Sequence, residues 1–250
     1  QISTARRQGR QLFHASAIKD TPQRQAIHMG KEMNSHPRDT GLHFDAATHT
    51  YTHLTTGRNL LSVTTLVERC FEQFDAIYWS ERKAPSMGIS PEELRRQWDE
   101  KRLQAAALGT ELHGRIEKYY NGCEDASAMC DTAYRHFRTF ADSARLKPYR
   151  TEWRIYDEDL GVAGTLDFLA YSNEPGIFDI WDWKRSDKMV CNGVLECESR
   201  WRKTAKEPIN HISDTTFMHY ALQLSIYRYI LERKYGIQVG HAYLGIFHPT

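Results

Sequence analysis

The sequence has little of three features that would narrow its function at once: long apolar runs, charge of one sign, and cysteine pairs. No apolar run among the 250 residues approaches membrane-spanning length, so we expect no membrane partner. The 33 basic and 32 acidic residues give a net charge of +1. This balance excludes a uniformly basic nucleic-acid coat, and any nucleic-acid-binding surface must be a local patch.

The five cysteines form no C-x-x-C pair. An odd number of cysteines in a chain without a membrane-spanning run indicates reduced thiols and an intracellular setting. The first 19 residues are basic and contain no acidic residue. This pattern leaves an organellar targeting segment open, although we favour a basic helical or disordered arm.

Three stretches are expected along the chain. Residues 1–41 are polar and indicate a helical or loosely ordered extension. Residues 42–86 combine a hairpin, turning at Thr55-Thr-Gly57, with a helix capped by Ser62 or Thr64 that runs to about Phe74 and packs on the core. Residues 87–250 hold the main core, which further residues beyond 250 could complete.

From Ser90 onward, the helix and strand signals alternate in a defined order. Ser90-Pro-Glu-Glu93 is a capping box with proline at the first helical position, and it predicts a helix to about Tyr120. A second helix is expected over 126–146, strands over 150–156, 162–171 and 177–184, a helix over 214–235, and a last strand over 239–247. With the second helix treated as an insertion, the order is αβββαβ. We therefore predict an α/β fold of the α+β type with a mixed sheet.

Two of the expected strands carry the residues that indicate chemistry. Asp182 and Lys184 are two apart, so they point to the same side of their strand. The short connection from the preceding strand predicts an antiparallel hairpin, which would set Asp167 beside Asp182. Adjacent carboxylates repel unless a cation lies between them, and oxygen ligands favour Mg²⁺ or Mn²⁺. Such a metal activates water while Lys184 stabilises a phosphate, although D-x-K alone would equally suit an ordinary surface hairpin.

Further polar residues recur at regular spacing. His113 and Glu117 lie four apart on one helix face, and His219, Gln223 and Tyr227 repeat every four residues. Glu152 alternates with apolar residues on the first strand, so it could share the face of Asp167. Each of these groups is more often a packing or surface residue when it occurs alone.

As a set, these motifs resemble the PD-(D/E)XK nuclease superfamily, RecB-like branch, and in it the mitochondrial genome maintenance exonucleases with their bacterial and viral relatives. The resemblance rests on Gly164-Thr-Leu-Asp167, Asp182-Trp-Lys184, His113 with Glu117, and Gln223-Leu-Ser-Ile-Tyr227, and it covers residues 43–248. The chain departs at Arg185, where the family usually has a small residue.

The resemblance implies a restriction-endonuclease-like core that binds one or two Mg²⁺ or Mn²⁺ ions. Asp167 and Asp182 would hold the metal, helped by His113 and the Trp183 backbone carbonyl, with Glu117 and Glu152 as further candidates. Lys184 would act on water and phosphate, and Gln223 and Tyr227 would face the cleft. Related nucleases with an iron–sulfur cluster carry a cysteine group after the last helix, but no cysteine follows Cys197, so we expect no cluster.

The segment after Lys184 is basic, with one aromatic residue, and could track phosphates and stack a base. Its candidate nucleic-acid-binding residues are Arg185, Arg200, Trp201, Arg202, Lys203 and Lys206. The alternative is a solvated loop, because Glu196, Glu198 and Glu207 dilute its charge.

We therefore predict a metal-dependent nuclease that hydrolyses DNA phosphodiester bonds. It would be an exonuclease on single-stranded or frayed ends, with a larger replication, repair or recombination complex as a possible partner. One alternative is a non-catalytic nucleic-acid-binding module, against which the intact Asp, Asp, Lys set argues. An RNA-processing nuclease is the other, because nothing in the sequence separates RNA from DNA.

Overall fold

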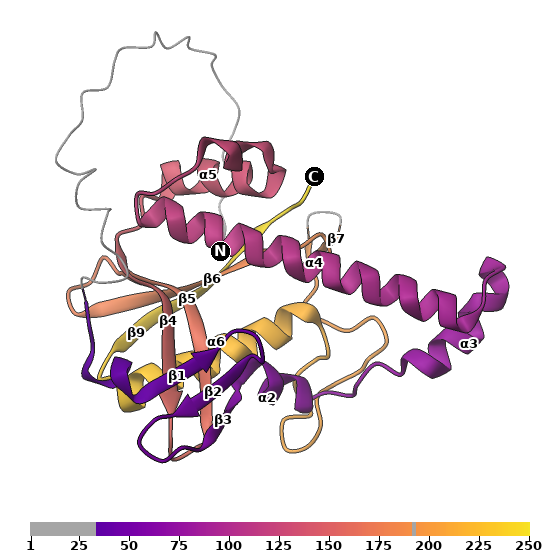
Figure 1. Cartoon of the computed structure of the whole chain (residues 1–250), viewed down its shortest axis with the longest axis horizontal. Coiled ribbons are helices and arrows are strands. Elements are labelled where there is room, and N and C mark those ends of the chain that lie inside the picture. Colours follow the sequence, from indigo (N-terminus) through magenta and orange to yellow (C-terminus); the bar gives the residue numbers. More distant parts are fainter. Residues whose placement is uncertain (1–33, 192–193) are drawn as a thin grey trace, which may run out of the picture.

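The structure, a computed structural model, describes residues 34–191 and 194–250, so most of the expected N-terminal extension lies outside the described residues. No helix in these two ranges is long and apolar enough to cross a membrane. Seven of the described strands form one sheet with parallel and antiparallel pairs, and helices cover both of its faces (Figure 1). The predicted α+β class with a mixed sheet is confirmed.

The sheet combines an N-terminal meander with a central group of strands. The meander consists of β1 (Leu42–Asp45), β2 (Thr50–His53) and β3 (Asn59–Ser62). The central strands are β4 (Pro148–Asp157), β5 (Val162–Tyr171), β6 (Ile177–Arg185) and β9 (Gln238–Phe247). Strands β4, β5 and β6 are antiparallel neighbours, whereas β9 pairs in parallel with β6, and β3 pairs in parallel with the start of β5. A separate small pair joins β7 (Val190–Cys191) to β8 (Val194–Leu195).

One edge of β5 is shared between two partners, and this sharing creates the site. Strand β3 pairs with residues 162 and 163 of β5, and β6 pairs with residues 168–171. Residues 164–167 lie between these two ladders and pair with neither strand on that edge. The gap coincides with the Gly164-Thr-Leu-Asp167 motif, so the backbone of this motif has no strand partner on that edge.

The helices begin where the sequence offers capping side chains. Ser62 accepts a hydrogen bond from the Thr65 N–H at 3.1 Å, and Ser90 accepts one from the Glu93 N–H at 3.1 Å. The α-helices are α2 (Val63–Arg69), α3 (Ala76–Met87), α4 (Pro91–Tyr120), α5 (Thr132–Ala144) and α6 (Thr216–Lys234). Two 3₁₀ helices, η1 (Pro37–Gly41) and η2 (Ala126–Cys130), complete the described helical structure.

Several predicted boundaries are corrected by the structure. The stretch before the expected turn at Thr55-Thr-Gly57 contains a turn of its own and forms two strands, β1 and β2, rather than one hairpin arm. The helix after Ser62 ends at Arg69 rather than near Phe74, and α3 was not predicted. The expected helix over 126–146 is divided into η2 and α5 at Asp131, whose carboxylate caps α5 by accepting the Ala133 N–H at 3.1 Å.

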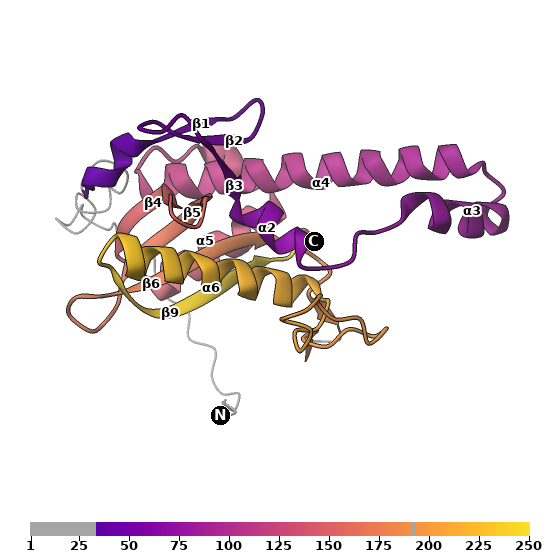
Figure 2. The same ribbon diagram turned by 90° about the horizontal axis from the view of Figure 1, so that it is seen from below.

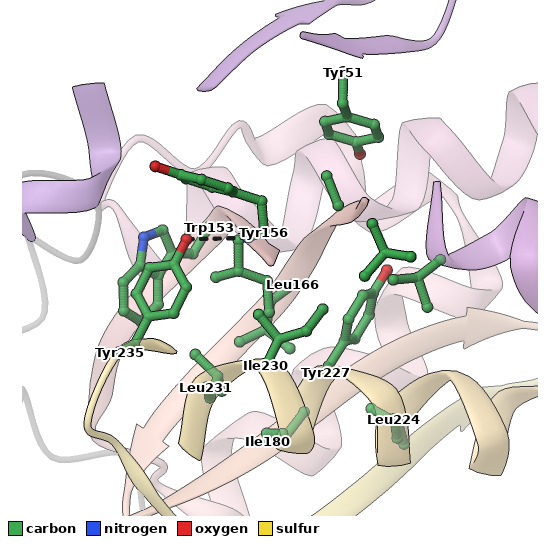
Figure 3. Packing of buried hydrophobic residues seen from close by; sticks show 14 of the residues in the cluster. Tyr51, Trp153, Tyr156, Leu166, Ile180, Leu224, Tyr227, Ile230, Leu231 and Tyr235 are labelled. Atoms are coloured by element: carbon green, nitrogen blue, oxygen red, sulfur yellow. Dashed lines mark hydrogen bonds between the residues drawn. The ribbon is translucent and has the colours of Figure 1, made fainter. Parts of the chain in front are cut away.

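Two apolar clusters lie on opposite faces of the sheet. On one face, α2 packs on the sheet through Val67. On the same face, α6 packs through Leu224 and Ile230 (Figure 3). On the other face, α4 and α5 pack through Leu112, Phe137 and Trp183. The N-terminal half of α4, with α3 packed along it, extends beyond the sheet (Figures 1 and 2). The C-terminal half of α4 therefore lies over the strands that carry the predicted site.

The end of the expected N-terminal extension is ordered against β4. Asp39, in η1, accepts hydrogen bonds from Arg150 at 2.6 Å and from the Trp153 indole N–H at 2.8 Å. Burial opposes ionisation of Asp39, but the His36 backbone N–H and these two donors outweigh it and lower the pKa of its carboxyl. These contacts fix residues 36–41 on the side of the molecule away from α3.

Candidate metal and active site

The site lies where β5 and β6 separate. Their ladder ends at the pair Phe168 and Trp181, and the next residues toward the gap are Asp167 and Asp182. The Trp183 N–H donates a hydrogen bond of 2.8 Å to Asp167 Oδ2, so the carboxylate takes the place of a strand carbonyl. The antiparallel hairpin predicted from the sequence is confirmed, and it brings Asp167 and Asp182 together at one end of the strand pair.

Asp182 is almost completely buried, with 1% of its surface exposed. Lys184 Nζ lies 2.6 Å from Asp182 Oδ2, and no described residue hydrogen-bonds to the other oxygen, Oδ1. Burial, and then the charge of Asp167, raise the pKa of Asp182 to about 6, although Lys184 opposes this rise. A buried carboxylate with an unpartnered oxygen is costly unless a further positive group satisfies it.

Lys184 is held in its charged form by the two aspartates. Burial favours the neutral amine, but the charges of Asp182 and Asp167 outweigh burial and raise the pKa of Lys184 above its ordinary value. The ammonium also lies 4.6 Å from the centre of the Tyr220 ring. Tyr220 was missed in the sequence, although its spacing from Gln223 and Tyr227 places it on the same stripe of α6.

His113 reaches the site from α4 on the opposite face. Its Nε2 lies 2.6 Å from the Trp183 carbonyl oxygen and must donate there, because a carbonyl only accepts. Nδ1 then faces Asp167 Oδ2 at 3.5 Å. His113 Nδ1 and the Asp167 carboxylate therefore converge on the same space, on the side away from the Trp183 carbonyl.

Glu152 completes a group that could hold a metal ion. Each of three residues offers one ligand atom, and these atoms lie within 4.8 Å of one another; the residues are His113, Glu152 and Asp167. Neighbours of Glu152 on β4 pair with Leu166 and Phe168, so Glu152 stands opposite Asp167. Its φ of 46° is in the left-handed region, which is unusual for a non-glycine residue in a strand and is typical of functional sites. Glu117 is half-buried on α4 and is not part of this group.

Gln223 and Tyr227 line the α6 side of the site. Gln223 donates a hydrogen bond of 3.1 Å to the Tyr227 hydroxyl. Tyr227 rises from α6 toward the sheet (Figure 3), and burial followed by the charge of Asp182 raises the pKa of its hydroxyl. A side chain at Gly164 would meet the Tyr227 ring at 2.6 Å, which explains the glycine at the start of the β5 motif. His219 instead stacks on Phe71 and hydrogen-bonds to Asp214.

The predicted basic residues do not form one patch. Arg185 lies in the α4 and α5 layer, with Nη2 3.8 Å from Asp131 Oδ1. Arg200 pairs with Glu196, and Lys203 Nζ lies 3.7 Å from Glu72. Lys206 donates to the Arg69 carbonyl oxygen at 3.1 Å at the end of α2. Arg202 and Trp201 remain the most freely presented members of this set, since both are exposed and no side-chain contact of either is seen among the described residues.

No protein-family profile and no curated protein sequence matches this chain.

Proposed function

We propose that the protein is a nuclease that uses Mg²⁺ or Mn²⁺ to hydrolyse phosphodiester bonds, with DNA as its substrate. The observation that carries this proposal is the buried Asp182 carboxylate, which has one unpartnered oxygen and lies beside Asp167 and Lys184. Two carboxylates and one ammonium in a water-poor site are poorly explained by stability alone, because ionised buried groups cost free energy.

The side chains present fit a hard divalent cation. Asp167, Glu152 and His113 supply two carboxylates and an imidazole within 4.8 Å of one another, whereas Asp182 lies outside this group. This donor set suits Mg²⁺ or Mn²⁺ and contains no thiolate that would select a softer metal. The four cysteines whose side chains are described are free thiols, which agrees with the intracellular setting that we propose.

The residues of the chain would divide the work of hydrolysis. A bound divalent cation would supply Lewis acidity and a more acidic water. The Trp183 N–H fixes the Asp167 carboxylate, and Asp182 holds the Lys184 ammonium at 2.6 Å. Lys184, charged and largely buried, would then stabilise the negative charge that develops on the phosphate. Gln223 donates to the Tyr227 hydroxyl and so holds it on the α6 side of the site.

The arrangement of elements supports the family suggested by the sequence. Strands β4, β5, β6 and β9 with helices α4 and α6 follow in the order αβββαβ, with α5 inserted after α4. In the PD-(D/E)XK nucleases, RecB-like branch, which the motifs resemble, the acidic residues and the lysine occupy the strands at the positions of Asp167, Asp182 and Lys184. We propose membership of this family on these grounds, with single-stranded or frayed DNA ends as substrate and a replication, repair or recombination complex as the setting.

A digestion panel tests the proposal. End-labelled linear and circular DNA and RNA, each single-stranded and duplex, would be incubated with Mg²⁺, Mn²⁺ or EDTA. We expect cleavage of linear single-stranded DNA that depends on the metal. Binding without cleavage of any substrate in either metal would favour a non-catalytic module, and cleavage of RNA alone would make the protein an RNA-processing nuclease.

A further inference from the structure

A pocket of about 490 Å³ lies between the start of α6 and the segment that follows β6. Its volume is within the range of small-ligand sites, about 300–1,000 Å³. Apolar side chains such as Met189 and Phe217 line one part of it, and Trp201 lines another. The pocket is separate from the group of carboxylates that would hold the metal, so its occupant need not be a metal ligand.

The pocket is a neighbour of the candidate active site along α6. Phe217 lies three residues before Tyr220, and residues three apart share one face of a helix. The Tyr220 ring in turn lies 4.6 Å from Lys184 Nζ. Three residues of helix, about 4.5 Å along its axis, therefore separate Phe217, which lines the pocket, from Tyr220, which contacts the lysine. The pocket and Lys184 are therefore close enough along α6 for one extended ligand to reach both.

Trp201 offers an unusually open aromatic surface. It is 84% exposed, the highest value among the large apolar side chains of the described residues. No described aromatic ring packs on it, whereas the other described tryptophans contact at least one ring. An indole with a free face at a pocket mouth is suited to stacking a planar ring.

The charges of the pocket oppose a phosphate and favour hydrogen-bond donors. Four carboxylates, those of Asp187, Glu196, Glu198 and Asp214, line it with only two cations, Lys188 and Arg200. Glu196 pairs with Arg200, and Asp214 contacts His219 at 2.8 Å. Asp187 and Glu198 make no side-chain ion pair or hydrogen bond with any other described residue, so their oxygens are available as acceptors.

We propose that this pocket binds one nucleobase of the substrate strand, next to the phosphate that Lys184 contacts. The base stacks on Trp201 and turns its donor edge toward Asp187 and Glu198. This inference rests on the proposed nuclease function and names the substrate feature that the site reads. Guanine, with two adjacent donors on its Watson–Crick edge, is preferred over thymine, whose single donor lies between two carbonyl acceptors.

Equilibrium binding in EDTA tests the pocket without cleavage. The probes are a fluorescein-labelled thymidine heptanucleotide and the seven versions of it that carry one guanine, each measured by fluorescence anisotropy. We expect guanine at one position to tighten binding by about 5-fold or more, the lower end of the discrimination that a good base contact provides. Trp201→Ala should weaken binding of that heptanucleotide by about 5- to 150-fold, as expected for the loss of one stacked base.

Two kinds of variant separate stacking from edge recognition. Asp187→Asn and Glu198→Gln keep the side-chain shape but replace an acceptor oxygen with a donor, so the guanine preference should fall toward the thymine value. Trp79→Ala, the same substitution at a tryptophan of α3, is the control and should leave binding unchanged. A flat guanine scan, or Trp201→Ala binding as tightly as the unaltered protein, would overturn the proposal.

Cleavage of the same heptanucleotides in Mg²⁺ distinguishes the two proposals. If the protein cleaves but shows no guanine preference that is lost in Trp201→Ala, the nuclease function stands and the base pocket is wrong. If guanine tightens binding and Trp201→Ala abolishes this effect, but neither Mg²⁺ nor Mn²⁺ supports cleavage, the base pocket stands and the nuclease function is wrong.

Discussion

Replacing Asp182 by asparagine should change how the stability of the metal-free protein depends on pH. In the native state, burial and Asp167 raise the pKa of the Asp182 carboxyl from 3.8 to about 6. At pH values between 3.8 and about 6, the Asp182 carboxyl therefore keeps its proton in the folded protein but has lost it in the unfolded chain. Stability from this group is fully present below about pH 4 and is lost as the pH rises through 6.

The magnitude follows from the size of the shift. A rise of about two pKa units corresponds to about 3 kcal/mol, and Asp182 is only 1% exposed, so solvent screening reduces this little. The free energy of unfolding of the unaltered protein, minus that of Asp182→Asn, should fall by up to about 3 kcal/mol between pH 4 and pH 7. Lys184 stays protonated throughout this range and does not alter the sign.

Urea unfolding in EDTA at four or five pH values measures this difference. Asp99→Asn, an exposed position on α4, is the control and should show no comparable pH-dependent change relative to the unaltered protein. Added Mg²⁺ or Mn²⁺ should stabilise the unaltered protein more than Asp182→Asn, because a bound cation favours the ionised carboxylate. If the stability difference between the unaltered protein and Asp182→Asn is independent of pH, Asp182 is not a buried acid with a raised pKa.

Four further predictions follow from the site. Lys184→Ala should lower turnover by three orders of magnitude or more, while single-strand affinity changes by less than about ten-fold. Lys101→Ala, at an exposed position on α4, is the control and should change neither quantity. An equal loss of turnover and affinity in Lys184→Ala would make Lys184 a docking residue. His113→Ala should weaken Mn²⁺ binding in calorimetry by at least about ten-fold, and Glu117→Ala by less, because only His113 belongs to the converging ligand group. Gly164→Ala should destabilise the fold by about 1–3 kcal/mol in urea unfolding, because the new side chain would meet the Tyr227 ring at 2.6 Å. Adding Tyr227→Leu should relieve part of this cost. An unchanged unfolding midpoint in Gly164→Ala would contradict the packing. Arg202→Ala should flatten the slope of log affinity against log salt by roughly 0.7. Lys206→Ala should leave this slope nearly unchanged, because Lys206 donates to the Arg69 carbonyl. A larger change in slope for Lys206→Ala than for Arg202→Ala would show that the nucleic acid contacts the α2 end of the loop.

The strand pattern of the site could be predicted because it depends on local rules. Alternation along β6 placed Asp182 and Lys184 on one side, and the short turn before Ile177 predicted the antiparallel pairing that brings Asp167 close. The αβββαβ order followed from the same helix and strand signals. These features need only the neighbours of each residue in the chain, which the sequence supplies directly.

Features that depend on distant contacts could not be predicted. The division of the β5 edge between β3 and β6 is a property of the whole sheet, and it decides where the opening lies. The left-handed φ of Glu152 has no local signal. The spacing of Tyr220 places it on the same stripe as Gln223 and Tyr227, but its contact with Lys184 depends on how α6 packs on the sheet. The predicted basic patch divides because its members have partners far away in the sequence. Arg185 lies near Asp131, the residue that caps α5, whereas Lys203 and Lys206 have partners at the end of α2.

Single-turnover cleavage of end-labelled single-stranded DNA tests whether a bound metal and Lys184 carry out hydrolysis. The unaltered protein and Lys184→Ala would be purified in parallel and compared over a Mn²⁺ titration with an EDTA control. We expect the unaltered protein to cleave with a rate that saturates in Mn²⁺ and EDTA to abolish cleavage. The cleavage rate of Lys184→Ala should be lower by at least three orders of magnitude. Equal rates for the two proteins, or cleavage that persists in EDTA, would contradict this role of the metal and Lys184.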